Sequence, residues 1–156
     1  MTNKIKLILS ILLPQVAGGL GGFLMGSSVS DWYLELQKSV ITPPDWVFGP
    51  VWVTLYLLMG IAAYLVWKRV NVDRSAKKAM NIYWIHLALN ASWTPIFFGL
   101  QNIFLALVNI VILWILILIL IFKFYKIKKT ASYLLIPYIL WVSIATYLNY
   151  TIWILN

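Results

Sequence analysis

Apolar and polar positions occur in long alternating blocks along this chain, and the apolar blocks predict helices that cross a membrane. Each of five apolar stretches approaches the roughly 20 residues that an α-helix needs to span a hydrocarbon core about 30 Å thick. The stretches run from Ile5 to Ser28, Trp46 to Trp67, Ala79 to Leu100, Phe104 to Tyr125 and Ala131 to Trp153. The pattern predicts a single domain over residues 1–156, an all-α membrane protein folded as a bundle of five transmembrane helices.

The basic residues sort to one side of the predicted bundle. Five crossings place the two termini on opposite sides, and eleven of the twelve basic residues then share the side of the N-terminus. They are Lys4, Lys6, Lys68, Arg69, Arg74, Lys77, Lys78, Lys123, Lys126, Lys128 and Lys129. The other side keeps Lys38 with Asp31, Glu35 and Asp45. The positive-inside rule therefore predicts a cytoplasmic N-terminus and an outside C-terminus in a bacterial plasma membrane.

Composition agrees with this class of protein and removes several others. The chain is 63% hydrophobic and 10% charged, whereas an ordinary soluble domain has about a quarter of charged residues. Its net charge of +8 lies at helix ends, where anionic lipid headgroups explain it, so nucleic-acid binding is a poor interpretation. The chain has no cysteine, which excludes disulfides and thiolate chemistry. The first stretch also resembles a signal peptide, but its length favours an uncleaved helix.

Two segments of the first third suggest how the helices pack. Gly18, Gly22 and Gly26 recur at every fourth residue and predict a helix-packing seam, either with a neighbouring helix of the same chain or with a second subunit. The long connection from Val29 to Asp45 carries apolar side chains and two prolines before the second span. Connections of that length in a compact bundle are usually structured or functional, so we interpret it as a lid.

Aromatic residues are unusually frequent, with nine Trp and nine Tyr. An interfacial belt explains those near predicted helix ends, such as Trp67, Tyr125 and Trp153. It does not explain those inside the spans, where an indole N–H needs a partner. These are Trp52 with Tyr56 one turn on, Trp93 with Phe97, and Trp141. They are candidates for a binding pocket, with ordinary core packing as the equal alternative.

Polar residues inside the spans are few. His86, Asn90 and Thr94 share one face of the third span, and such groups should face the bundle interior. For Asn90 and Asn149, a helix–helix hydrogen bond and a ligand contact are equally good interpretations. No charged residue falls in the middle of a span, which argues against active transport. His86 is the sole imidazole of the chain and has no second metal ligand beside it, so we expect no structural metal site. The one metal that His86 could still bind is the iron of a haem, as an axial ligand.

Three motifs identify a family resemblance. They are ITPPDWVFGPVW at 41–52, LNASW at 89–93 leading to IFFG at 96–99, and LIPY at 135–138 followed by ATYLN at 145–149. Their order and spacing closely resemble those of the tryptophan-rich sensory proteins, also called translocator proteins or peripheral-type benzodiazepine receptors. The resemblance covers essentially the whole chain.

The resemblance implies a five-helix bundle, commonly a homodimer, with a pocket under the first loop for porphyrins and other hydrophobic ligands. Trp52 and Trp141 match tryptophans of the family that face the pocket and are implicated in light-dependent porphyrin breakdown in some members. The other matching pocket positions are Tyr33, Pro43, Asn90, Trp93 and Ala145. The resemblance implies no obligatory cofactor, and a porphyrin such as protoporphyrin IX or haem is the expected ligand.

The chain departs from the family pattern in two places that bear on its ligand. The sterol-recognition pattern of animal members needs a basic residue after the C-terminal tyrosine, and none follows Tyr150, so sterol binding has little support. His86 stands where many relatives carry an amide.

The leading hypothesis is a receptor or sensor that binds a porphyrin among Trp52, Trp93 and Trp141, with Asn90 and His86 as polar partners. Photodegradation of the porphyrin ranks second and passive translocation of porphyrins or lipids ranks third.

Overall fold

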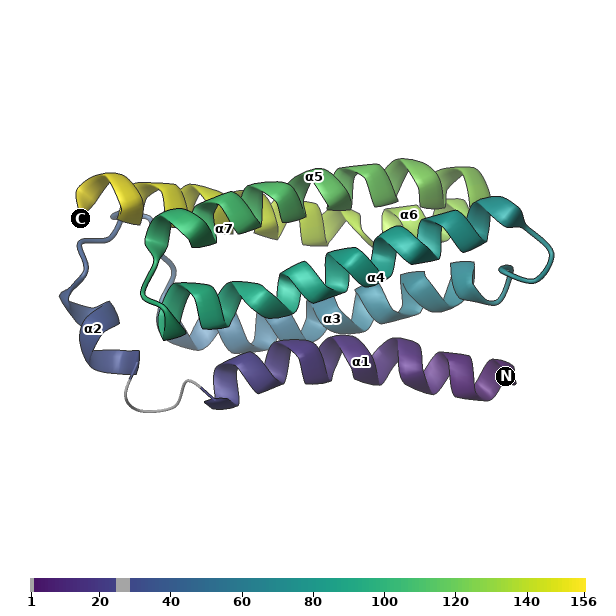
Figure 1. Cartoon of the computed structure of the whole chain (residues 1–156), viewed down its shortest axis with the longest axis horizontal. Helices are drawn as coiled ribbons and strands as arrows, with labels where there is room; N and C mark the ends of the chain where they lie inside the picture. The colour runs from purple at the N-terminus through teal and green to yellow at the C-terminus, as the bar shows by residue number, and fades with distance from the viewer. Residues whose placement is uncertain (1, 25–28) are drawn as a thin grey trace.

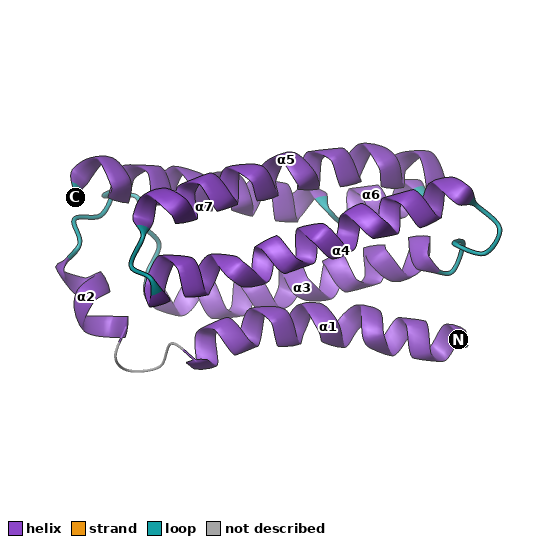
Figure 2. Ribbon diagram, viewed as in Figure 1, coloured by secondary structure: helices purple, strands orange, loops and turns teal. Residues whose placement is uncertain are grey.

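The structure, a computed structural model, describes residues 2–24 and 29–156, and side-chain surroundings for 2–19 and 31–156. All regular structure in this part of the chain is helical, as Figure 2 shows, so the all-α prediction is confirmed there. The helices are α1 (Asn3–Leu24), α2 (Val29–Glu35), α3 (Asp45–Trp67), α4 (Arg74–Thr94), η1 (Pro95–Gly99), α5 (Ile103–Ile127), α6 (Lys129–Tyr133) and α7 (Ile136–Leu155).

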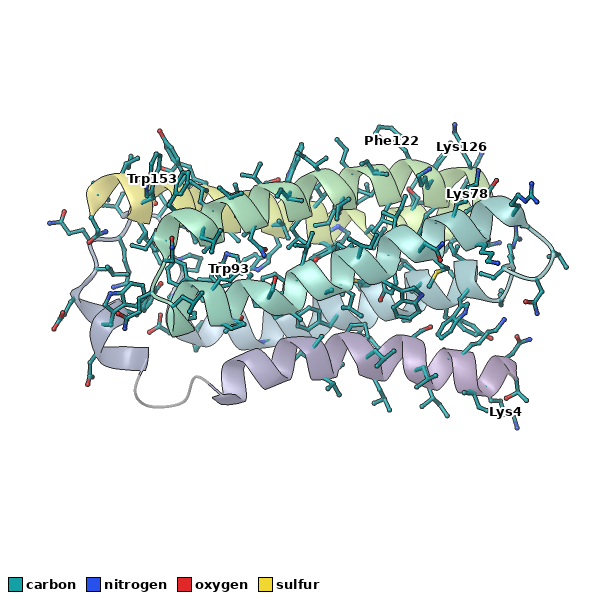
Figure 3. The ribbon with its side chains drawn as sticks, viewed as in Figure 1. Lys4, Lys78, Trp93, Phe122, Lys126 and Trp153 are labelled. Atoms are coloured by element: carbon teal, nitrogen blue, oxygen red, sulfur yellow. The ribbon has the colours of Figure 1, made fainter. Side chains whose placement is uncertain are left out.

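The long helices α1, α3, α4, α5 and α7 run lengthwise through one bundle (Figure 1). The N-terminus and the C-terminus lie at opposite ends of this bundle, and α2 lies beside the C-terminal end. In Figure 3, Lys4, Lys78 and Lys126 all lie at the N-terminal end. The basic residues that are far apart in the sequence therefore gather at one end of the molecule.

Three helical segments of the described residues are long and apolar enough to cross a membrane: Asp45–Trp67, Ile103–Ile127 and Lys129–Leu155. The last one joins α6 and α7 across a turn at 134–135. The helix α4 falls outside this group because Arg74, Lys77 and Lys78 open it and His86 and Asn90 lie inside it. The structure thus supports an all-helical membrane protein with three clear spanning segments.

Local sequence explains where the helices begin and break. Asp73 caps α4, since its carboxylate accepts hydrogen bonds from the N–H groups of Ser75 (2.7 Å) and Ala76 (3.4 Å). The side chain of Asn102 accepts from the N–H of Leu105 at 2.9 Å and begins α5 in the same way. Pro137, near the start of α7, has no N–H to donate, and the turn between α6 and α7 lies just before it.

Small residues let the helices of the core approach closely. Ala62 and Ala63 of α3 and Ala76 and Ala79 of α4 are fully buried. One close approach is at Gly60, where an added Cβ would lie 2.5 Å from the backbone oxygen of Ser10 in α1. The backbones of α1 and α3 therefore pack against each other with no side chain between them at this point.

A cavity lined by aromatic side chains

A cavity of about 610 Å³ lies inside the half of the bundle nearer α2. We call it the aromatic cavity. It is lined by Gln15, Gly18, Gly19, Tyr33, Asp45, Phe48, Gly49, Trp52, Val53, Tyr56, Asn90, Trp93, Thr94, Phe97, Phe98, Ile110, Leu113, Ala145, Leu148, Asn149 and Ile152. Its size and its mostly apolar lining, with a few polar groups, are typical of small-molecule sites.

Two stacked pairs of aromatic rings form part of the cavity wall. Trp52 and Tyr56 lie one helical turn apart in α3, and their ring centroids are 5.3 Å apart with an angle of 28° between the planes. Trp93 of α4 and Phe97 of η1 stack at 4.9 Å and 18°. All four residues line the cavity, and an aromatic wall of this kind suits a flat and apolar ligand.

Hydrogen bonds fix the orientation of Trp93. Its indole N–H donates to the amide oxygen of Asn149 at 3.1 Å, and the amide nitrogen of Asn149 donates to the backbone oxygen of Ile103 at 3.1 Å. Three helices, α4, α5 and α7, therefore meet at this ring. The interpretation of Asn149 as a helix–helix hydrogen bond is confirmed, and the same side chain also lines the cavity.

The end of the third predicted span is a π-helical turn. Pro95 cannot donate a backbone hydrogen bond, and the N–H of Leu100 donates to the oxygen of Pro95 at 2.9 Å. The chain then turns through Gln101, which has a φ of +52°. The wider turn carries Phe97 and Phe98 to the cavity wall.

The helix α2 packs against this turn and closes one side of the cavity. Trp32 meets Phe97 edge-on at 5.6 Å, and Tyr33 meets Phe98 edge-on at 5.6 Å. Tyr33 also lines the cavity. Burial raises the pKa of the Tyr33 hydroxyl, and the nearby carboxylate of Asp45 raises it further, so this group stays a protonated donor.

Three further contacts involve the first loop. The backbone N–H of Gln37 donates to the amide oxygen of Asn156 at 2.9 Å, and the amide nitrogen of Asn156 donates back to the oxygen of Gln37 at 3.0 Å. The ammonium group of Lys38 lies 4.4 Å from the centre of the Tyr33 ring. Lys38 is thereby placed next to a residue of the cavity wall.

A buried chain of hydrogen bonds leads from the cavity into the core. The hydroxyl of Tyr56 donates to the amide oxygen of Asn90 at 3.1 Å, and the amide nitrogen of Asn90 donates to the hydroxyl of Tyr138 at 2.9 Å. The hydroxyl of Tyr138 is in turn 2.9 Å from Nε2 of His86. Asn90 belongs to both the cavity wall and this chain, so its helix–helix hydrogen bond is confirmed, while its contact with a ligand stays a prediction.

The structure brings most of the predicted ligand-binding residues to the cavity wall. Those that line it are Tyr33, Trp52, Tyr56, Asn90, Trp93, Phe97 and Ala145, while Pro43, His86 and Trp141 do not. His86 is fully buried behind Tyr138. Trp141 lies behind Phe48, which it meets edge-on at 5.7 Å, and its indole N–H is buried without a hydrogen-bond partner. Neither residue lines the cavity: His86 is linked to its wall through Tyr138 and Asn90, and Trp141 contacts the lining residue Phe48.

The structure describes the surroundings of one of the three glycines in the predicted helix-packing seam. A Cβ at Gly18 would overlap the ring of Tyr56, so the ring of α3 lies directly on the backbone of α1. Gly22 and Gly26 lie outside the residues whose surroundings are described. Gly18 also lines the aromatic cavity, which connects helix packing to the shape of the site.

Sequence reasoning missed several residues of the cavity wall. Gln15 is one of them, and its amide nitrogen donates to the backbone oxygen of Val53 at 3.0 Å. A lone amide in an otherwise apolar span is a signal that would have found it. Phe48 was visible within the first motif, but no sequence pattern indicated that it lines the cavity and contacts Trp141.

The fold and the cavity together define an all-helical membrane protein with an internal cavity lined by aromatic side chains. The chain belongs to the TspO/MBR family, whose model matches residues 10–154. It is 41% identical to the tryptophan-rich protein TspO of Archaeoglobus fulgidus, over 99% of both chains. It is 37% identical to the translocator protein of Homo sapiens, over 91% of this chain and 85% of that protein, and 35% identical to the tryptophan-rich sensory protein of Cereibacter sphaeroides, over 81% and 77%. The resemblance read from the motifs is confirmed.

Proposed function

We propose that this protein is a membrane receptor or sensor that binds porphyrins and other flat hydrophobic ligands in the aromatic cavity. The observation that carries the proposal is the pair of ring stacks, Trp52 with Tyr56 and Trp93 with Phe97, on the wall of one cavity of about 610 Å³. A flat macrocycle buries its two faces against such rings, and burial supplies about 25 cal/mol per Å² of apolar surface. The word "sensory" in the name of the Cereibacter sphaeroides relative supports the same role.

The polar groups of the cavity would orient the ligand. Asn90 keeps its amide in place through Tyr56 and Tyr138, so it offers the ligand a fixed rather than a mobile partner. Tyr33 adds a protonated hydroxyl from the side of α2. With few polar groups at fixed positions, the site would accept a range of apolar ligands and still favour those that carry a matching polar edge.

The test is a titration of the purified protein with protoporphyrin IX in darkness, followed through porphyrin absorbance and tryptophan fluorescence. We expect saturable binding, weakened about ten-fold or more by Trp93→Ala, because this change removes one ring of a stack and frees Asn149. The matched control is Trp153→Ala, which removes an indole that is 42% exposed and does not line the cavity. Equal losses in the two variants would mean that the porphyrin binds elsewhere.

Light-dependent degradation of the bound porphyrin is a second candidate function. The observation in its favour is that Trp52 lines the cavity. Illumination in the presence of oxygen should then bleach the porphyrin bands in the wild type and not in Trp52→Phe, while both proteins still bind in the dark. Trp141→Phe tests the tryptophan behind Phe48 in the same way. Bleaching that is equal in all three proteins would assign it to the free porphyrin.

We also propose the finer membrane topology, with five crossings, a cytoplasmic N-terminus and an outside C-terminus, in a bacterial plasma membrane. The opposite ends of the two termini and the gathering of lysines at one of them support it (Figures 1 and 3). The chain has no cysteine, so single thiols can report on sidedness. A membrane-impermeant maleimide should label Val40→Cys in intact cells and Asn71→Cys only after permeabilisation. Both positions are exposed. The reverse result would invert the topology.

A further inference from the structure

A second hollow lies at the other end of the bundle from α2, between the start of α4 and the end of α5. It encloses about 440 Å³, and its polar lining comes from Ser75, Lys78, Lys123 and Lys126. We call it the basic groove. Figure 3 places Lys78, Lys126 and Phe122, which also lines the groove, close together at the N-terminal end of the bundle. None of these residues belongs to the aromatic cavity.

Along α5, the side chains that line the groove change from apolar to basic. Ile119, Phe122, Lys123 and Lys126 are separated by three, one and three residues, so they share one face of the helix. Ile119 lies seven residues before Lys126, which is about 10 Å along the helix axis. The apolar part of the groove is therefore the part nearer the middle of the membrane, and the ammonium groups lie towards the helix end.

The ammonium groups in the groove have no carboxylate partner in the described part of the chain. Of the four acidic residues, three belong to α2 and the start of α3, at the far end of the bundle. The fourth, Asp73, does not line the groove, and its carboxylate caps α4. A further cation lies at its edge, since the guanidinium of Arg69 donates to the backbone oxygen of Ile127 at 2.7 Å. The groove thus concentrates positive charge without internal compensation.

We propose that the basic groove binds an anionic phospholipid, with the phosphate between Lys78, Lys123 and Lys126 and an acyl chain along Phe122 and Ile119. A phosphate is the compact anion that several ammonium groups can share, and basic pockets between membrane helices are suited to such headgroups. Phe122 is 62% exposed on a helix that is apolar enough to cross a membrane, so lipid chains have direct access to it. A soluble anion would use the lysines and leave this apolar surface uncovered.

The experiment measures lipid retention by native mass spectrometry of the full chain in detergent, titrated with phosphatidylglycerol or with phosphatidylcholine. We expect one phosphatidylglycerol to be retained in preference to phosphatidylcholine. A triple variant, K78Q with K123Q and K126Q, should weaken this retention by about ten-fold or more. The matched control, K4Q with K77Q and K128Q, removes the same charge from exposed lysines outside the groove and should change it by less than about three-fold.

Further experiments distinguish a phospholipid from a soluble phosphate and test the contact with the acyl chain. The variant Phe122→Ala should weaken phosphatidylglycerol binding, and glycerol 3-phosphate and inorganic phosphate should compete only at far higher concentration. Equal losses of lipid retention in the two triple variants would mean that the basic end of the bundle attracts the lipid only diffusely. This result would overturn the proposed site. Competition by glycerol 3-phosphate at lipid-like concentrations, or a Phe122→Ala protein that binds lipid normally, would overturn the lipid assignment.

Discussion

The side-chain amide of Asn90 donates a hydrogen bond of 2.9 Å to the hydroxyl of Tyr138, and this bond ties the wall of the aromatic cavity to the buried core. The same hydroxyl lies 2.9 Å from Nε2 of His86. Tyr138 and His86 are both fully buried, so Nε2 of His86 could not turn to water if the hydroxyl were lost. One oxygen atom therefore connects an amide of the cavity wall to a buried imidazole in the core.

The first prediction concerns Tyr138→Phe. This change leaves the amide nitrogen of Asn90 and Nε2 of His86 without their partner, and an unsatisfied buried polar group costs about 1–3 kcal/mol. We expect the thermal midpoint in detergent to fall by several degrees. The matched control is Tyr83→Phe. Tyr83 is also fully buried, but its hydroxyl has no hydrogen-bond partner, so its removal should leave the midpoint unchanged or raise it. Equal falls in the two variants would contradict the hydrogen-bond account.

The second prediction concerns the contact between α1 and α3. In Gly60→Ala, the new methyl group would lie within 3 Å of the backbone of Ser10 and Ile11, which cannot move aside as a flexible side chain can. We expect a loss of about 1–3 kcal/mol in the free energy of unfolding, measured by denaturant titration in mixed micelles. Gly49→Ala meets nothing within 4 Å and serves as the control. A Gly60→Ala protein as stable as the wild type would show that the two backbones are farther apart.

The glycine contacts also show what the sequence can predict about packing. Gly18, Gly22 and Gly26 form a visible repeat, and at Gly18 the expected close approach is found, against Tyr56. Gly60 belongs to no repeat, yet the backbones of α1 and α3 meet at this residue. Helical spacing identifies the face of a helix, but the neighbour of that face depends on the order of the helices around the bundle, which no local pattern contains.

The sequence likewise predicts some residues of the candidate site and not others. Trp52, Trp93 and Asn90 reach the cavity because helical spacing and the motifs both mark them. His86 shares a helix face with Asn90, but four residues place it about 6 Å farther along the axis, behind Tyr138 and beyond the cavity wall. The position of Trp141 behind Phe48 depends on how α7 is rotated in the bundle. Depth and rotation are tertiary properties, so these two residues could not be placed from spacing alone.

The third prediction uses Gly18→Ala to change the shape of the cavity without removing a lining side chain. The added methyl group would overlap the ring of Tyr56, which must move into the cavity or away from Trp52. We expect the affinity for protoporphyrin IX to fall about five-fold or more, with far-ultraviolet circular dichroism unchanged. Gly19→Ala is the matched control, because Gly19 also lines the cavity and a methyl group there meets nothing within 4 Å. If Gly18→Ala left the affinity for protoporphyrin IX unchanged, the position of the Tyr56 ring would not matter for binding.

The fourth prediction concerns the charge of the ligand. Lys38 is the one basic residue predicted for the side of α2, and its ammonium group lies over the ring of Tyr33, which lines the cavity. A carboxylate at the edge of a bound porphyrin would find its nearest cation there, and exposed charge pairs contribute up to about 1 kcal/mol. In Lys38→Gln we expect protoporphyrin IX to bind up to about five-fold more weakly, whereas its uncharged dimethyl ester should bind equally to both proteins. Rising salt should narrow the difference between the two proteins for the acid alone, because ions screen an exposed pair. Parallel losses for the acid and the ester would assign Lys38 a role in holding α2 instead of a role in recognising the ligand's charge.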